Sequence, residues 1–196
     1  RFPVALTGLS LSAGRCVAQT VDGGRRPTVA AVRAEQPPEL DGELSDACWQ
    51  SASKFADFTL MQLRQPLPLA TEAYVCYDQR AVYAAFYAHD PEPGKIRAQE
   101  TKRDGDVYED DLVELLIDEK HEFRSYSYFM VNPLGTQAER ISGGTAYNIT
   151  WKGDWKAAAK RVHDGWTAEL AIPWELLRYP KGATAFGLMF ARRVPR

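Results

Sequence analysis

Tyr108-Glu-Asp-Asp-Leu-Val-Glu-Leu-Leu-Ile-Asp118 is an apolar run that begins with an aromatic ring and three carboxylates. Its β-branched and aliphatic residues favour a β-strand. Side chains on a strand alternate between its two faces. The two faces then carry, respectively, Leu112, Glu114 and Leu116, and Val113, Leu115 and Ile117. The stretch therefore predicts a strand with one carboxylate set into an otherwise apolar face.

Glu114 decides what this face does. A carboxylate among apolar neighbours is costly to bury unless a partner hydrogen-bonds or pairs with it. Together with the Tyr108 ring six residues upstream, it would suit a sugar, because the ring packs on C–H groups and the carboxylate accepts hydrogen bonds from hydroxyls. The alternative is an edge glutamate paired with a neighbouring Arg or Lys. Both interpretations stay open at this point.

Composition and charge limit the protein class. The 196 residues suit one domain, and 45% hydrophobic and 26% charged residues are ordinary for a globular chain. The net charge of −2 and pI of about 6.0 give no basic field for nucleic acid. The segment 104–122 is acidic and the segment 191–196 is basic, which is typical of a solvated surface.

The first 37 residues read as a leader and linker. Residues 2–14 are apolar or small, and Cys16-Val-Ala18 resembles the end of a secretory signal. The run is too short to span a bilayer. Residues 19–38 are rich in Gly, Arg and Pro, with one extended segment at 28–33. We expect the folded domain to cover 38–196 and to be truncated at its C-terminus, because the sequence stops within a predicted strand.

Short strand patterns dominate the rest of the chain. We expect hairpins from 71–77 with 81–88 and from 112–118 with 125–132, and further strands at 147–151, 155–162, 166–172 and 186–194. His163-Asp-Gly165 is the sharpest turn signal. Residues 45–49 form a helical turn capped by Ser45 or Asp46, and residues 173–179 form a short helix. These elements predict an all-β fold, an antiparallel β-sandwich (immunoglobulin-like or jelly-roll-like) with one or two short helical turns.

The carboxylates do not predict catalysis. A glycosidase needs two carboxyl groups about 5 Å or about 6.5–9.5 Å apart. Asp110 and Glu114 share a strand face but lie about 13 Å apart at about 3.3 Å per residue. Asp111 and Glu114 point to opposite faces. A distant partner such as Glu169 stays open, but there is no nucleophile motif, phosphate loop or dinucleotide fingerprint, and we expect a binding module rather than an enzyme.

The acidic loop is a weak calcium candidate. Asp104, Asp106 and Asp110 are clustered hard oxygen donors in a Gly-containing segment, with Asp111 next to them. Their spacing does not match an EF-hand. The alternative is a solvated turn.

Cysteine and tryptophan residues favour structural roles. Cys48 and Cys76 form either a bridge or two buried thiols. Trp166 alternates with apolar residues of its strand and belongs to the core, and Trp174 anchors the short helix. Of the five tryptophans, Trp151 and Trp155 are the ones most open to partial exposure, while a core position is favoured for each tryptophan.

Four motifs in order resemble the family 9 carbohydrate-binding modules, over roughly residues 38–196. They are Leu40-Asp-Gly-Glu-Leu-Ser-Asp-Ala-Cys-Trp49, Tyr108-x-x-Asp111-x-Val113-Glu114, Val131-Asn-Pro-Leu-Gly-Thr136 and Asp164-Gly-Trp-Thr-Ala-Glu-Leu-Ala-Ile-Pro173. The closing stretch 186–196 is similar to the junction between such a module and a bacterial outer-membrane barrel of uncharacterised function.

The resemblance implies a β-sandwich that binds glycan ends and holds structural calcium. It places Tyr108 at the family's first stacking tryptophan and Glu114 at its hydroxyl-binding glutamate. Asp111, between them in the motif, completes the candidate carbohydrate-binding set. The second stacking tryptophan would lie beyond residue 196, and the family's arginine on the next strand has no match in 125–132.

The implied function is non-catalytic carbohydrate binding. The module would target a larger secreted, periplasmic or envelope protein of polysaccharide catabolism to glycan. It would not span the membrane itself and would take no nucleic acid. One alternative is a structural cap of an outer-membrane barrel protein that has lost sugar binding. Another is an accessory module of a glycoside hydrolase, which hydrolyses O-glycosyl bonds through a domain outside this sequence.

Overall fold

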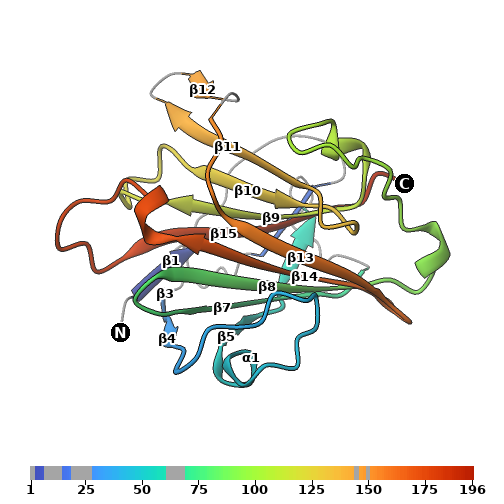
Figure 1. The fold of residues 1–196 in the computed structure, drawn as a ribbon, viewed down its shortest axis with the longest axis horizontal. Coiled ribbons are helices and arrows are strands. Elements are labelled where there is room, and N and C mark those ends of the chain that lie inside the picture. Colours follow the sequence, from blue (N-terminus) through green and yellow to red (C-terminus); the bar gives the residue numbers. More distant parts are fainter. Residues whose placement is uncertain (1–2, 7–14, 19–27, 61–68, 144–145, 149–150) are drawn as a thin grey trace.

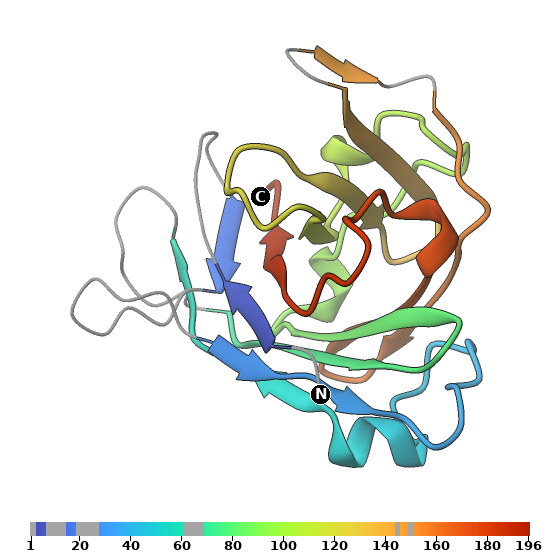
Figure 2. The same ribbon diagram turned by 90° about the vertical axis from the view of Figure 1, so that its left-hand side faces the viewer.

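Two β-sheets pack face to face in this computed structural model, which describes residues 3–6, 15–18, 28–60, 69–143, 146–148 and 151–196 (Figures 1 and 2). The nine-stranded large sheet has the order β12 (Ala146–Asn148), β11 (Gln137–Gly143), β10 (Ser127–Val131), β9 (Leu112–Asp118), β15 (Phe186–Arg193), β1 (Pro3–Leu6) and β3 (Thr28–Ala30). At its side, β2 (Arg15–Ala18) pairs with β15 and with β6 (Phe58–Leu60). The predicted sandwich is confirmed.

The six-stranded small sheet has the order β13 (Lys156–Val162), β14 (Gly165–Pro173), β8 (Ala81–His89), β7 (Thr71–Tyr77) and β4 (Val32–Arg33), and β5 (Ser53–Phe55) also pairs with β7. Pairing is antiparallel except between β1 and β15 and between β4 and β7. The extended segment expected at 28–33 thus supplies β3 to one sheet and β4 to the other.

The predicted hairpins form. β7 pairs with β8, β9 with β10, and β13 with β14. The last pair turns at Gly165, whose φ is 152°, and a Cβ there would lie 2.2 Å from the Ala88 carbonyl oxygen. The turn therefore requires glycine.

The core lies between the sheets. Leu115 and Ile117 of β9 face Phe86 and Trp166 of the small sheet in one buried cluster. Trp155 takes the core position favoured for each tryptophan rather than partial exposure, because its ring is fully buried and packs edge-on against Phe129 at 5.3 Å. Apolar packing overrides the polar residues that flank it in sequence.

Helical structure is short. The helix α1 (Ala47–Ser51) follows Asp46, whose side chain makes no capping hydrogen bond, and it buries Trp49 and Cys48. The described residues also form the 3₁₀ turns η1 (Pro93–Lys95), η2 (Val107–Glu109) and η3 (Trp174–Leu176). Cys48 and Cys76 are two buried free thiols, and burial raises the pKa of each. Among the residues described, no helix is long and apolar enough to cross a membrane.

Candidate functional site

The outer face of the large sheet carries Glu114. Strand register places this residue of β9 directly between Met130 of β10 and Ala191 of β15, and Met130 in turn faces Ala138 of β11. Paired residues share a face, so Glu114 sits on the side of the sheet that points away from the core. Its side chain is fully buried. The predicted carboxylate in an apolar sheet face is therefore present.

Tyr108 lies at the start of this face. It belongs to η2, directly before β9, and packs against an apolar cluster that includes Leu112 and Met130. The guanidinium carbons of Arg140 and Arg193 lie 4.9 Å and 5.8 Å from the centre of its half-buried ring. Arg193 Nε also donates a 2.6 Å hydrogen bond to the Tyr108 carbonyl oxygen. Two cation–π contacts thus fix the ring at the edge of the outer face.

Neither arginine is predicted from the sequence. Arg140 stands on β11, a strand that was not predicted, opposite Tyr128 of β10. Arg193 closes β15 opposite Leu112, within the basic segment that was interpreted as plain surface. Strand β11 lies one strand beyond β10, the strand on which the resemblance places the family's arginine. The signal in the sequence for Arg140 was its place in an alternating strand pattern after the Asn132–Gly135 turn.

Asp111 is directed elsewhere. Its fully buried carboxylate accepts a 2.9 Å hydrogen bond from the Arg97 backbone N–H and pairs with Arg196 Nη1 at 3.2 Å. Arg196 in turn pairs with Asp90, which follows β8 of the small sheet. Burial raises the pKa of Asp111, while the Arg97 hydrogen bond and Arg196 oppose the rise. Asp111 therefore ties the end of the sandwich together, away from Glu114.

The acidic loop is held by hydrogen bonds from N–H groups. Asp110 accepts from the backbone N–H of Gln99 and Glu100 at 2.9 and 2.8 Å, and from Asn132 Nδ2 at 2.9 Å. Asp104 Oδ1 accepts from the Glu139 N–H at 3.2 Å, and Oδ2 lies 3.3 Å from Lys152 Nζ.

Asp106 is exposed, and Glu100 Oε2 accepts a hydrogen bond from its backbone N–H. Over the described chain, no three or more His, Cys, Asp or Glu side chains are grouped to hold a metal ion. The Asp104 and Asp110 carboxylates accept hydrogen bonds from N–H groups here, and the calcium site stays a prediction.

Glu169 is a structural residue in this arrangement. It is fully buried on β14, and its Oε1 accepts a 2.8 Å hydrogen bond from Trp49 Nε1. Its Oε2 accepts from the backbone N–H of Gly42 at 2.8 Å and of Asp41 at 3.1 Å. Burial raises the pKa of Glu169 to about 7, although the hydrogen bonds from these three donors lower it. Because every contact goes to the 41–49 loop, this carboxylate does not meet Glu114 as a catalytic partner.

A sequence model of the carbohydrate family 9 binding domain-like family matches residues 40–193. The chain belongs to this family. The matched residues contain the Trp49–Glu169 contact and the outer face built by β9, β10, β11 and β15. A search of curated proteins finds no match.

Solved structures share the fold. A family 9 carbohydrate-binding module from Caldicellulosiruptor kristjanssonii, solved with cellotriose and again with glucose, is similar with a TM-score of 0.56 and 16% identity over 83% of each chain. A candidate carbohydrate-binding protein from Bacteroides uniformis is similar with a TM-score of 0.59 and 13% identity, over 86% of this chain and 89% of that one.

Proposed function

We propose that this protein is a non-catalytic glycan-binding module whose site is the outer face of the large sheet. The observation that carries the proposal is the convergence of Tyr108, Glu114, Arg140 and Arg193 on that face, from η2 and three strands of a family 9 sandwich. The similar module from Caldicellulosiruptor kristjanssonii binds cellotriose and glucose, which supports a glycan as the ligand class.

Each residue of the proposed site has its own chemical role in binding a sugar. The Tyr108 ring offers apolar surface to the C–H face of a sugar. Glu114 accepts hydrogen bonds from hydroxyls, and the arginine guanidinium groups donate to sugar oxygens. Because the Glu114 side chain is fully buried, a sugar reaches it only when the groups that cover it move. Arg140 and Arg193, which contact the Tyr108 ring, are half-buried and carry long, flexible side chains.

The wider role follows from this chemistry. A non-catalytic carbohydrate-binding module serves a larger protein by holding it on glycan. We propose that the parent is a secreted, periplasmic or envelope protein of polysaccharide catabolism. The acidic segment 104–111 remains the place to seek a bound calcium ion. Affinity for one sugar end is expected between millimolar and micromolar, or about −4 to −8 kcal/mol.

Affinity electrophoresis on gels that contain soluble glucan or xylan tests this proposal. The wild-type chain is expected to be retarded by at least one polysaccharide, and Glu114→Gln is expected to migrate as on a gel without glycan. Leu134→Ala, which removes an exposed apolar side chain on a turn, is the matched control and should stay retarded. Equal retardation of wild type and Glu114→Gln would contradict the proposed site.

A structural module is the second candidate, and the enclosure of Glu114 favours it. A fully buried carboxylate beside a ring that already packs under two guanidinium groups can serve the fold alone. Such a module would act as a cap on an attached membrane protein. In that case no glycan retards the chain, and Glu114→Gln changes the free energy of unfolding without changing migration.

A further inference from the structure

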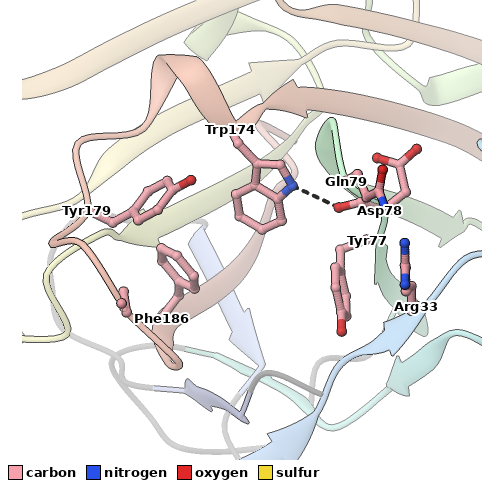
Figure 3. A pocket seen from close by; sticks show the side chains of 9 residues that line it. Arg33, Tyr77, Asp78, Gln79, Trp174, Tyr179 and Phe186 are labelled. Atoms are coloured by element: carbon pink, nitrogen blue, oxygen red, sulfur yellow. Dashed lines mark hydrogen bonds between the residues drawn. The ribbon is translucent and has the colours of Figure 1, made fainter.

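An open cavity lies at the end of the sandwich away from Tyr108, with a volume of about 380 Å³ (Figure 3). It is bordered by Arg33 of β4, by the β7–β8 turn, by η3 and by the start of β15 at Phe186. Arg193, which contacts Tyr108, is seven residues further along β15, or about 23 Å at the rise of a strand. The cavity is therefore separate from the outer-face site.

Aromatic rings form its walls. Trp174 lies against Phe186 with ring centres 5.6 Å apart at 33°, and Tyr179 meets Phe186 edge-on at 5.3 Å. Tyr77 borders the other side and meets Trp174 edge-on at 6.4 Å. Figure 3 shows Trp174, Tyr179 and Phe186 on one side of the opening and Tyr77 and Arg33 on the other. Three of these rings come from one short stretch of chain.

The Trp174 ring is held in place by its hydrogen bond. Its Nε1 donates to the Asp78 carbonyl oxygen at 2.9 Å. Asp78 itself is fixed, because its carboxylate accepts from the backbone N–H of Arg80 and Ala81 at 2.7 and 2.9 Å and from Tyr83 at 3.1 Å. A ligand binds more tightly to a ring that is already held in place than to a mobile ring, because less side-chain entropy is lost on binding.

Polar groups stand at the rim. Arg33 and Gln79 are exposed and border the cavity together with the rings. A guanidinium and a side-chain amide supply several donors and one acceptor in planar groups. The Asp78 carboxylate is already used by its own turn. Flat apolar walls with planar hydrogen-bonding groups at the rim fit a ligand with C–H faces and hydroxyl edges.

We propose that this end cavity binds a neutral pyranose ring and is a second glycan contact of the module. Its volume lies within the range of about 300–1,000 Å³ found for small-ligand sites. The inference does not need the outer-face site, because no residue is shared between them. Two weak contacts at opposite ends of one sandwich would hold a long glycan, or two neighbouring chains, more tightly than either contact alone.

Nuclear magnetic resonance of the five tryptophan indole N–H groups tests the proposal, after ¹⁵N labelling and assignment by single Trp→Phe variants. Glucose, xylose and cellotriose are the probes. We expect at least one of them to shift the Trp174 indole signal and to saturate it. Tyr179→Ala and Gln79→Ala, which change exposed side chains, should weaken this titration at least tenfold. Leu134→Ala should leave it unchanged.

A Trp174 signal that stays fixed with every sugar would overturn the inference, as would a titration that Tyr179→Ala and Gln79→Ala leave intact. A signal that moves with N-acetyltryptophanamide but with no sugar would also overturn it, since the occupant would then be an aromatic peptide. Glu114→Gln separates the two sites. A Trp174 titration that survives this change supports the end cavity even where the outer face binds nothing.

Discussion

Trp49 Nε1 donates a 2.8 Å hydrogen bond to Glu169 Oε1, and the two residues are 120 positions apart in the chain. The contact joins α1 to the middle of β14, and it connects two of the sequence motifs that lie far apart in the chain. Both partners are buried, at 4% and 0% exposure. Residues that looked like separate sequence signatures are thus one structural element of the sandwich.

Removing this donor should destabilise the protein. Trp49→Phe keeps the ring in the core but leaves Glu169 Oε1 without its 2.8 Å partner. We expect the free energy of unfolding to fall by about 1–3 kcal/mol, the cost of losing one partner of a buried polar group. Urea unfolding followed by circular dichroism measures it. A change below about 0.5 kcal/mol would show that the contact contributes nothing.

Stability should depend on pH through Glu169. Burial raises its folded-state pKa from 4.5 to about 7. An acid with a raised folded pKa binds more protons when folded, so its contribution is present at low pH and is lost as pH rises through the folded value. We expect the free energy of unfolding to decline from about pH 5 to pH 8. Glu169→Gln should flatten that decline, and identical slopes in both proteins would refute the assignment.

Gly42 should tolerate no side chain. Its φ is +82°, and a Cβ would lie 2.9 Å from the Lys160 backbone nitrogen and from the Ala159 carbonyl carbon. Gly42→Ala is expected to cost at least about 1–3 kcal/mol, because strain at positive φ adds to a backbone clash. Gly94→Ala is the control, since its Cβ meets nothing within 4 Å. Thermal unfolding compares them, and equal melting temperatures would contradict the prediction.

Arg192 should hold the two sheets together at one end. Its fully buried Nη1 donates to the His89 carbonyl at 2.8 Å and to Thr71 Oγ1 at 3.1 Å, and Nη2 lies 3.6 Å from Asp90. Arg192→Met removes one partner of a buried ion pair, which typically costs about 3–5 kcal/mol. Urea unfolding at low and high salt gives the value. A loss that vanishes in high salt would mean that the pair is solvated, since buried pairs are screened little.

Local pattern was enough to predict most of the fold. Alternation and turn residues gave the β7–β8, β9–β10 and β13–β14 hairpins, because each pair is adjacent in the chain. Strand β11 was not predicted, because Glu139 stands at a position of its buried face where strand alternation calls for an apolar residue. Glu139 is buried through a 2.6 Å contact with Arg103, 36 residues away, which no local pattern reveals.

The candidate site also has one part that the sequence predicts and one part that only the fold reveals. Tyr108 and Glu114 lie within one motif and could be selected from sequence. Arg140 and Arg193 reach the Tyr108 ring from two other strands, and only the strand order β11–β10–β9–β15 places them there. The end cavity could not be predicted from the sequence either, because only the tertiary fold brings Arg33 and Trp174 to the same cavity.

Isothermal titration of the wild-type chain with cellotriose, beside Tyr108→Phe and Tyr108→Ala, tests the outer-face site most directly. Tyr108→Phe keeps the stacking ring and should bind within about threefold of wild type, whereas Tyr108→Ala should lose at least tenfold, or about 1.4 kcal/mol. Heat that saturates equally in all three proteins, or no heat from a folded wild type with cellotriose, glucose or xylo-oligosaccharides, would contradict glycan binding at Tyr108 and Glu114.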